Sequence, residues 1–156
     1  MPTDTPDKAR VIALPPLIVV PILALGLLIH FIWPVRLLPH TYALWLGALL
    51  IVVSIPIVIW AALELRKAKT AFDVRKPTTA IVTGGVFGTT RNPTYLSMAL
   101  GFLGIAFLVN SLWLLLLTIP LVIIFQKGVI EPEEYYLERK FGEKYLGYKN
   151  RVRRWI

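Results

Sequence analysis

Acidic residues beside apolar stretches are the residues of this 156-residue sequence best suited to chemistry. Glu64 lies near the end of one apolar stretch, and Glu131, Glu133 and Glu134 directly follow another. Ionisable groups at such positions are costly beside lipid and commonly serve a function; here they suit a cationic ligand or an amino-acid ammonium group. A second interpretation stays open, because Glu133 and Glu134 would also be favourable in the solvated first turn of a helix.

Other catalytic groups are scarce. The sequence has no cysteine, which excludes a thiolate nucleophile, a disulfide and a zinc–thiolate site. His30 and His40 have no carboxylate or histidine neighbour at metal-ligand spacing, so no metal site is expected. Gly84, Gly85 and Gly88 cluster together but lack the GxGxxG register and a surrounding βαβ unit. This cluster is therefore equally compatible with a flexible loop.

The elements that must position these groups are four apolar segments, at residues 14–33, 42–65, 93–109 and 112–130. A helix that spans a bilayer needs about 20 mostly apolar residues, with a range of about 17–25. Backbone polar groups in lipid must be satisfied within the segment, which favours helices. We therefore predict an all-α integral membrane protein of one domain, with four transmembrane helices, the last two forming a hairpin. A polar N-terminal segment (1–13), a loop (66–92) and a tail (131–156) complete it.

Positive charge is distributed very unevenly over these segments. Two of the 17 Lys and Arg residues precede the first span, six lie in the loop 66–92 and eight lie from Lys127 onward, which leaves Arg36 on the other side. The positive-inside rule places the crowded face, with both termini, in the cytoplasm. Because topology and attraction to anionic lipid explain the net charge of +8, nucleic acid is not an expected partner.

The tail carries one apolar face at helical spacing. Its apolar residues recur at steps of three and four, at Leu137, Phe141, Tyr145, Tyr148, Val152 and Trp155. This pattern predicts an amphipathic helix, loosened at Gly142 and Gly147. Two locations remain open, because such a helix can lie on the inner leaflet or fold over a cytoplasmic active site.

Two sequence signatures carry a resemblance to a known family. TGGVF at 83–87 followed by RNPTY at 91–95 resembles the first signature of the isoprenylcysteine carboxyl methyltransferase family, which related phospholipid methyltransferases share. The tail EPEEYYLERKFGEKYLGYKNRVRRW resembles the second, with paired glutamates, FG, two spaced tyrosines and a basic end. The resemblance covers residues 79–155, about half of the chain, and the short length is typical of prokaryotic members. It implies a multi-pass protein of a bacterial or archaeal cell membrane.

The resemblance implies S-adenosyl-L-methionine as the cofactor, held in a cytoplasmic pocket under the C-terminal helices at 131–156. It assigns cofactor binding to Thr79, Ala80, Ile81, Val82, Phe87, Asn92, Pro93, Thr94, Tyr95 and Glu133. Free backbone N–H groups at the start of the third span suit the cofactor carboxylate. Arg91 is the candidate catalytic residue, orienting the loop or an anionic substrate, and it is equally compatible with a charge that only sets topology.

Two departures from the family pattern bear on the substrate. Asn92 stands where histidine is commoner, which removes a titratable group. Val129 stands where eukaryotic members have an arginine assigned to substrate, and Lys127 is the nearest base. We therefore expect a methyltransferase acting on a lipophilic or small acceptor, with a carboxylate, amine or thiol as the methylated group. Two alternatives remain: an NADPH-dependent membrane reductase of similar C-terminal architecture, and a non-enzymatic membrane scaffold.

Overall fold

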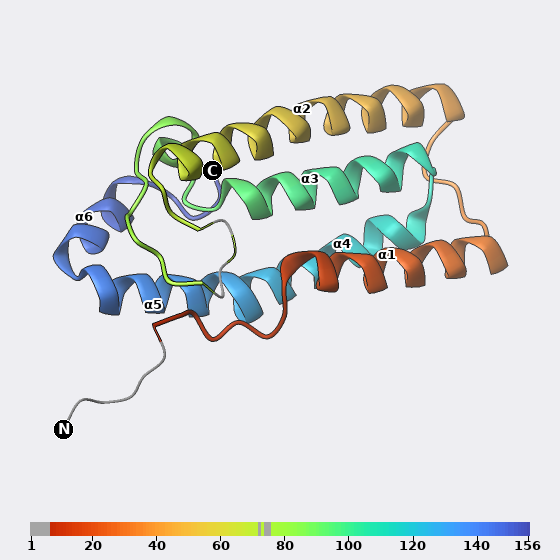
Figure 1. Ribbon diagram of the computed structural model, residues 1–156. Coiled ribbons are helices and arrows are strands. Elements are labelled where there is room, and N and C mark those ends of the chain that lie inside the picture. The colour runs from red at the N-terminus through yellow and green to blue at the C-terminus, as the bar shows by residue number, and fades with distance from the viewer. Residues whose placement is uncertain (1–6, 72, 74–75) are drawn as a thin grey trace.

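The computed structural model describes residues 7–71, 73 and 76–156, and the described residues form helices without a strand. Six α-helices, a short 3-10 helix and a π-helical turn occur in this described part of the chain (Figure 1). Their bounds are α1 Pro15–Ile32, α2 His40–Lys67, η1 Gly85–Gly88, α3 Pro93–Leu108, α4 Leu112–Phe125, η2 Gln126–Ile130, α5 Glu131–Phe141 and α6 Glu143–Arg151. The expected all-α class is confirmed.

Three continuous helical stretches are long and apolar enough to cross a bilayer: α1, α2 and the run Leu112–Phe141. The third apolar segment forms α3, which at 16 residues is shorter than these three. The fourth segment ends its regular α-helix at Phe125, five residues earlier than expected, and continues through the π-helical turn η2 into α5. The chain is thus a multi-pass membrane protein, with three helices of clear spanning length and a shorter apolar one.

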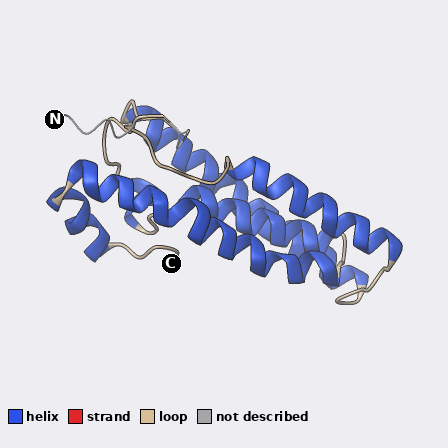
Figure 2. Cartoon of the chain, turned by 90° about the horizontal axis from the view of Figure 1, so that it is seen from below, coloured by secondary structure: helices blue, strands red, loops and turns tan. Residues whose placement is uncertain are grey.

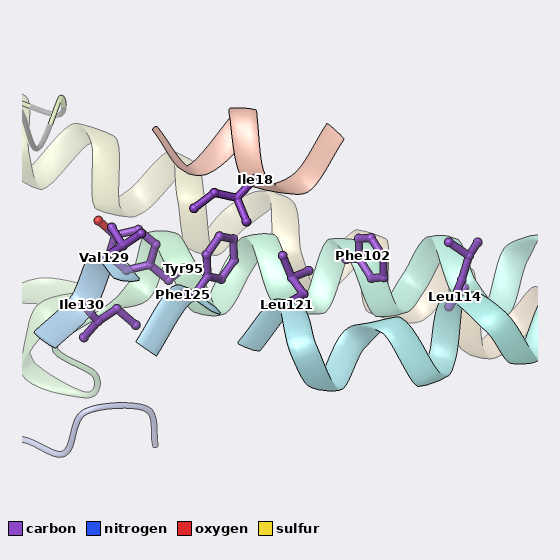
Figure 3. Packing of buried hydrophobic residues seen from close by; sticks show 9 residues of the cluster. Ile18, Tyr95, Phe102, Leu114, Leu121, Phe125, Val129 and Ile130 are labelled. Carbon is purple, nitrogen blue, oxygen red and sulfur yellow. The ribbon is translucent and has the colours of Figure 1, made fainter. Parts of the chain in front are cut away.

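The core of the bundle lies between α1, α3 and α4. Figure 3 shows Phe102 of α3 beside the α4 side chains Leu114 and Leu121, with Ile18 of α1 above Tyr95 and Phe125. These six side chains are nearly or completely buried, while many apolar residues of α1 and α2 are exposed, as expected for surfaces that face lipid. The apolar residues therefore fall into two groups: one packs in the inner core, and the other faces the bilayer.

Helix α2 lies along α3 at a close approach between small residues. A Cβ added at Gly47 would lie 2.7 Å from the Leu108 backbone nitrogen and 2.8 Å from the Gly104 carbonyl oxygen. Small residues at such crossings let helix backbones approach closely in membranes, where packing drives association. The position of α3 relative to α2 thus depends on Gly47.

The two connections at one end of the bundle are fastened by a single asparagine. Asn110 has a positive φ of 56°, and its side-chain oxygen accepts hydrogen bonds from the backbone N–H groups of Leu37 and Leu38. Its amide nitrogen donates to the Leu38 carbonyl at 2.7 Å. Asparagine tolerates the left-handed backbone conformation, which explains its place in this turn.

All longer polar segments lie at the opposite end. In Figure 1 the loop between α2 and α3, the helices α5 and α6 and the C-terminal end gather at one end of the bundle, and Figure 2 shows the same gathering from a second direction. The tail is two helices instead of one, because Gly142 takes a φ of 53° and breaks it between α5 and α6. This end positions the candidate site.

Candidate functional site

A pocket of about 310 Å³ lies at the polar end of the bundle. Its walls come from the start of α1, the end of α2 and the loop that follows, the start of α3, and the helices α5 and α6. Small-molecule sites commonly have volumes of about 300–1,000 Å³, so the pocket is large enough for a ligand of cofactor size. The segments that form it are far apart in the sequence.

The structure brings together eight of the ten residues that the resemblance assigned to the cofactor. The pocket is lined by Ala80, Ile81, Val82, Phe87, Asn92, Thr94, Tyr95 and Glu133, and also by Arg91. Thr79 and Pro93 do not line it. The Thr79 N–H donates to Thr70 Oγ1 at 3.1 Å and its hydroxyl donates to the Lys69 carbonyl, which holds the lining segment on the end of α2. Pro93 is buried in the first turn of α3, where its missing N–H costs nothing.

Glu133 and Tyr95 meet on the pocket wall. The Tyr95 hydroxyl donates to Glu133 Oε2 at 2.7 Å, and the Tyr95 ring packs on Phe125 at 5.7 Å between centroids (Figure 3). Tyr95 is 5% exposed, so this donor is fixed by packing. Within the described chain Glu133 has no ion-pair partner, so a carboxyl group without a counter-charge lies on the pocket wall.

Glu134, the next residue, has the opposite surroundings. It is 4% exposed, and its carboxylate pairs with the Arg91 Nη2 at 3.1 Å and the Arg154 Nη2 at 2.8 Å. The hydrogen bond to Glu134 raises the pKa of Arg154 above its usual value. Arg91 also donates from Nη1 to the Lys149 carbonyl at 3.1 Å. The guanidinium of Arg91 is thus held by α5 and α6.

The C-terminal segment closes the pocket by hydrogen bonds to the first signature. The Arg154 carbonyl accepts from Asn92 Nδ2 at 3.1 Å and from the Thr90 hydroxyl at 3.2 Å. The Tyr148 hydroxyl donates to the Phe87 carbonyl at 2.7 Å. Burial raises the pKa of Tyr145 and Tyr148 well above the usual tyrosine value, so both phenols stay protonated. The tail is therefore part of the pocket wall.

The π-helical turn η2 contains Val129 and Lys127, the two positions considered for substrate recognition in the sequence. Val129 is fully buried in the core, and Lys127 is exposed and pairs with Glu131 at 3.0 Å. Neither lines the pocket. π-helical turns are rare overall but occur often at functional sites. This one ends at Ile130, shortly before Glu133 and Glu134.

Several pocket residues were missed by sequence reasoning. They are the polar residues Thr70, Asp73 and Thr78, the apolar residues Leu14, Pro15, Pro16, Leu65 and Met98, and the tail tyrosines Tyr145 and Tyr148; Glu134, one of the acidic residues considered from the sequence, also lines the pocket. The sequence placed Tyr145 and Tyr148 on the apolar face of the tail. Their hydroxyl groups, which are polar groups on that apolar face, were the signal that could have assigned them to the pocket. The threonines carry no such signal, since nothing in their spacing marks them.

Comparison with known proteins gives two matches. The model of the phospholipid methyltransferase family matches residues 42–144, which include α2, α3, α4, α5 and the start of α6. A protein of Haemophilus influenzae named only as an uncharacterized protein is 47% identical over 64 residues, which cover 40% of this chain and 98% of that protein. The family match covers well over half of the chain and both segments that carry the pocket carboxylates. The chain therefore belongs to the phospholipid methyltransferase family and is a membrane methyltransferase.

Proposed function

We propose that the protein transfers a methyl group from S-adenosyl-L-methionine to a lipophilic or small acceptor at the cytoplasmic face of the membrane. The observation that carries this proposal is the uncompensated Glu133 carboxylate, fixed by Tyr95 on the wall of a pocket built from both signature segments. Within the proposed topology α3 serves as a fourth span, so that the pocket and the basic face lie on the same side.

The residues present fit this cofactor. Its ammonium and sulfonium groups are cationic, and Glu133 offers a carboxylate without a cation of its own. Phe87 and Tyr95 add aromatic faces to the same pocket, where a cation is attracted by the ring electrons. When bound, S-adenosyl-L-methionine supplies an electrophilic methyl group on an already activated leaving group. The protein then needs to orient the acceptor and exclude water, and orientation alone contributes about 7–11 kcal/mol in well-aligned systems.

The charges of the pocket favour an amine or thiol acceptor over a carboxylate. Arg91 is the one cation among the described lining residues, and Glu134 already neutralises it. The lining carboxylates outnumber it, so a carboxylate acceptor would be desolvated without a partner, which is costly. Val129 lies in the core and Lys127 points away, so neither supplies the missing charge. The apolar end of the pocket, at Leu14, Pro16 and Leu65, suits a lipophilic acceptor.

Calorimetry on the detergent-purified protein tests the cofactor. We expect S-adenosyl-L-methionine and its demethylated product to bind and NADPH not to bind. Glu133→Ala should weaken cofactor binding about tenfold or more, because hydrogen bonds to charged groups contribute about 1.5–3 kcal/mol. Glu131→Ala is the matched control, since that carboxylate pairs with Lys127 outside the pocket. Binding of NADPH alone would support the reductase, and binding of neither cofactor would support the scaffold.

A methylation assay with labelled cofactor tests the acceptor. Phosphatidylethanolamine and small thiols represent amine and thiol acceptors, and a farnesylcysteine analogue represents the carboxylate class. We expect turnover on one of the first two. Turnover on the farnesylcysteine analogue alone would contradict the charge argument while leaving the methyltransferase assignment intact.

A further inference from the structure

A second cavity, of about 380 Å³, lies outside the methyltransferase pocket and shares no lining residue with it. One wall is the segment before α1, with Asp7, Lys8 and Arg10, and the other wall is the first three turns of α5. The walls are fastened together, because Asp7 Oδ1 accepts from Lys140 Nζ at 2.6 Å and from the Tyr136 hydroxyl at 2.8 Å. The cavity is therefore a built feature of the fold.

The charge around this cavity is strongly positive. It is lined by four cations and, among the described residues, one carboxylate, Asp7, which is already paired with Lys140. Lys8 and Arg10 have no hydrogen-bond or ion-pair partner within the described chain. Arg139 lies over the Tyr135 ring, 5.8 Å from its centroid, and has no ion-pair partner among the described residues. Three cations thus converge without a counter-charge, which favours an anion.

The position of the cavity indicates where that anion comes from. Its α5 residues run from Pro132 to Lys140, two to ten residues beyond Ile130, where the apolar stretch ends. At 1.5 Å per residue this is about 3–15 Å along the helix, which overlaps the headgroup layer of about 5–8 Å on each side of a bilayer. Tyr135 is 62% exposed there, as interfacial tyrosines are.

Exposed apolar side chains continue from the cavity toward the bilayer. Ile12 and Leu17, which follow Arg10 in the chain, are 67% and 63% exposed. A free phosphate ion would leave this apolar surface exposed, whereas the acyl chains of a phospholipid would cover it. The cations and the apolar strip together match one molecule with an anionic head and an apolar body.

We propose that this cavity binds the headgroup of an anionic phospholipid of the surrounding bilayer, with its acyl chains along Ile12 and the start of α1. The lipid is a bound structural partner, and its binding does not depend on methyl transfer. It joins the segment before α1 to α5, the helix that carries Glu133.

Native mass spectrometry of the full-length protein in detergent tests this site, with phosphatidylglycerol and phosphatidylcholine as probes and glycerol 3-phosphate as the soluble arm. Basic residues near a membrane surface attract anionic lipid by about 1 kcal/mol each, so we expect phosphatidylglycerol to bind about tenfold or more tightly than phosphatidylcholine. Arg10→Gln/Arg139→Gln should reduce this preference to about twofold or less. Lys144→Gln/Arg151→Gln removes two exposed charges of α6 and should leave the preference unchanged.

Circular dichroism verifies that both double variants keep their helix content. If the site variant loses it, Arg10→Gln alone gives the same comparison, because Arg10 has no partner within the described chain. Equal loss of preference in both double variants would mean that only total charge matters, and would overturn the proposal. Binding of glycerol 3-phosphate as tight as that of the lipid would also overturn it.

Discussion

Glu133 and Glu134 are adjacent in the sequence, and the folded chain gives them different tasks. Glu134 is buried between two arginines that belong to the first signature and the tail, so it holds those segments together. Glu133 instead lines the pocket, with a tyrosine hydroxyl as its fixed partner. The paired glutamates of the tail signature thus divide into one residue that supports the site and one that faces it.

Glu134→Gln should destabilise the protein far more than Glu131→Gln. Removing one member of a buried ion pair leaves an uncompensated charge and costs about 3–5 kcal/mol, which in a chain of this size lowers Tm by about 6 °C or more. Glu131 is partly exposed and pairs with the exposed Lys127 at 3.0 Å and, at 3.4 Å, with Arg154, so its loss should cost about 0–1 kcal/mol. Thermal unfolding in detergent measures both. Equal shifts would mean that the buried network contributes little.

Tyr95→Phe should weaken binding of S-adenosyl-L-methionine without unfolding the protein. The ring packing is kept, but Glu133 loses the donor that fixes it, and ordering a free side chain on binding costs about 0.5–1.5 kcal/mol, about two- to tenfold in Kd. Calorimetry on the variant measures this change. Tyr135→Phe is the matched control, because Tyr135 is exposed and lies outside the pocket. The same weakening in both variants would contradict a specific role for Tyr95.

Helix α3 matters at the next scale, because it carries Tyr95 and begins directly after Asn92. Its position is set by the close crossing with α2 at Gly47 and Gly104. Helix α2 in turn ends where the lining segment around Thr70 begins. The close crossing lies near the start of α2 and the end of α3, and the pocket lies at the other end of the same two helices.

Gly47→Ala should destabilise this helix pair. The added methyl would meet backbone atoms of α3 at 2.7–2.8 Å, and overpacking of this kind costs about 1–3 kcal/mol. Gly147→Ala should have the opposite sign, since nothing lies within 4 Å of its Cβ and alanine in a helix gains about 0.5–1 kcal/mol over glycine. Thermal unfolding of the two variants compares them. A stabilised Gly47→Ala protein would contradict the close crossing.

The sequence was sufficient to predict which segments form helices. It was not sufficient to predict the local backbone geometry within and between them. The apolar runs gave α1 and α2 to within about two residues, since a run of that length in lipid has only the helix available. The π-helical turn has no marker in QKGVI, and it takes up one extra residue, so a regular pattern extended from α4 misplaces α5 by about 100°. The break at Gly142 was visible only as a weak point in the apolar face.

The pocket shows the same division. The signature residues from Ala80 to Tyr95, with Glu133, could be named from the sequence because they follow fixed motifs, and the structure places eight of them in one pocket. Thr70, Thr78 and the apolar residues Leu14, Pro16 and Leu65 could not be named. Their place in the pocket depends on where the start of α1 and the end of α2 lie in space. The arginines that neutralise Glu134 lie 43 residues before it and 20 after it, a pairing that local spacing does not reveal.

At the scale of the whole molecule, the charge asymmetry and the site coincide. The polar segments, and with them nearly all Lys and Arg residues, gather at the end of the bundle that holds the pocket (Figure 1). The opposite end has two short connections around Asn110. In the proposed topology, with α3 as a fourth span, the even number of crossings would put every polar segment on one side.

Reporter fusions test that arrangement. A reporter joined at Ile156 should be cytoplasmic, and one inserted near Leu38 should be on the outside, because the positive-inside rule favours the basic face in the cytoplasm. Paired reporters that are active on opposite sides give the readout. Both insertions on the same side would exclude four crossings and would require that α3 does not span.

The scattered origin of the pocket walls also dictates when the site can first exist. Its residues come from the beginning of α1, the loop before α3 and the tail up to Tyr148, so a nascent chain that has inserted α1, α2 and α3 still has no pocket. Glu133, and Arg154, which pairs with the neighbouring Glu134, are synthesised after all three of these helices. A chain that has not yet added α5 and α6 therefore lacks the pocket, which forms only when these helices fold back onto the rest.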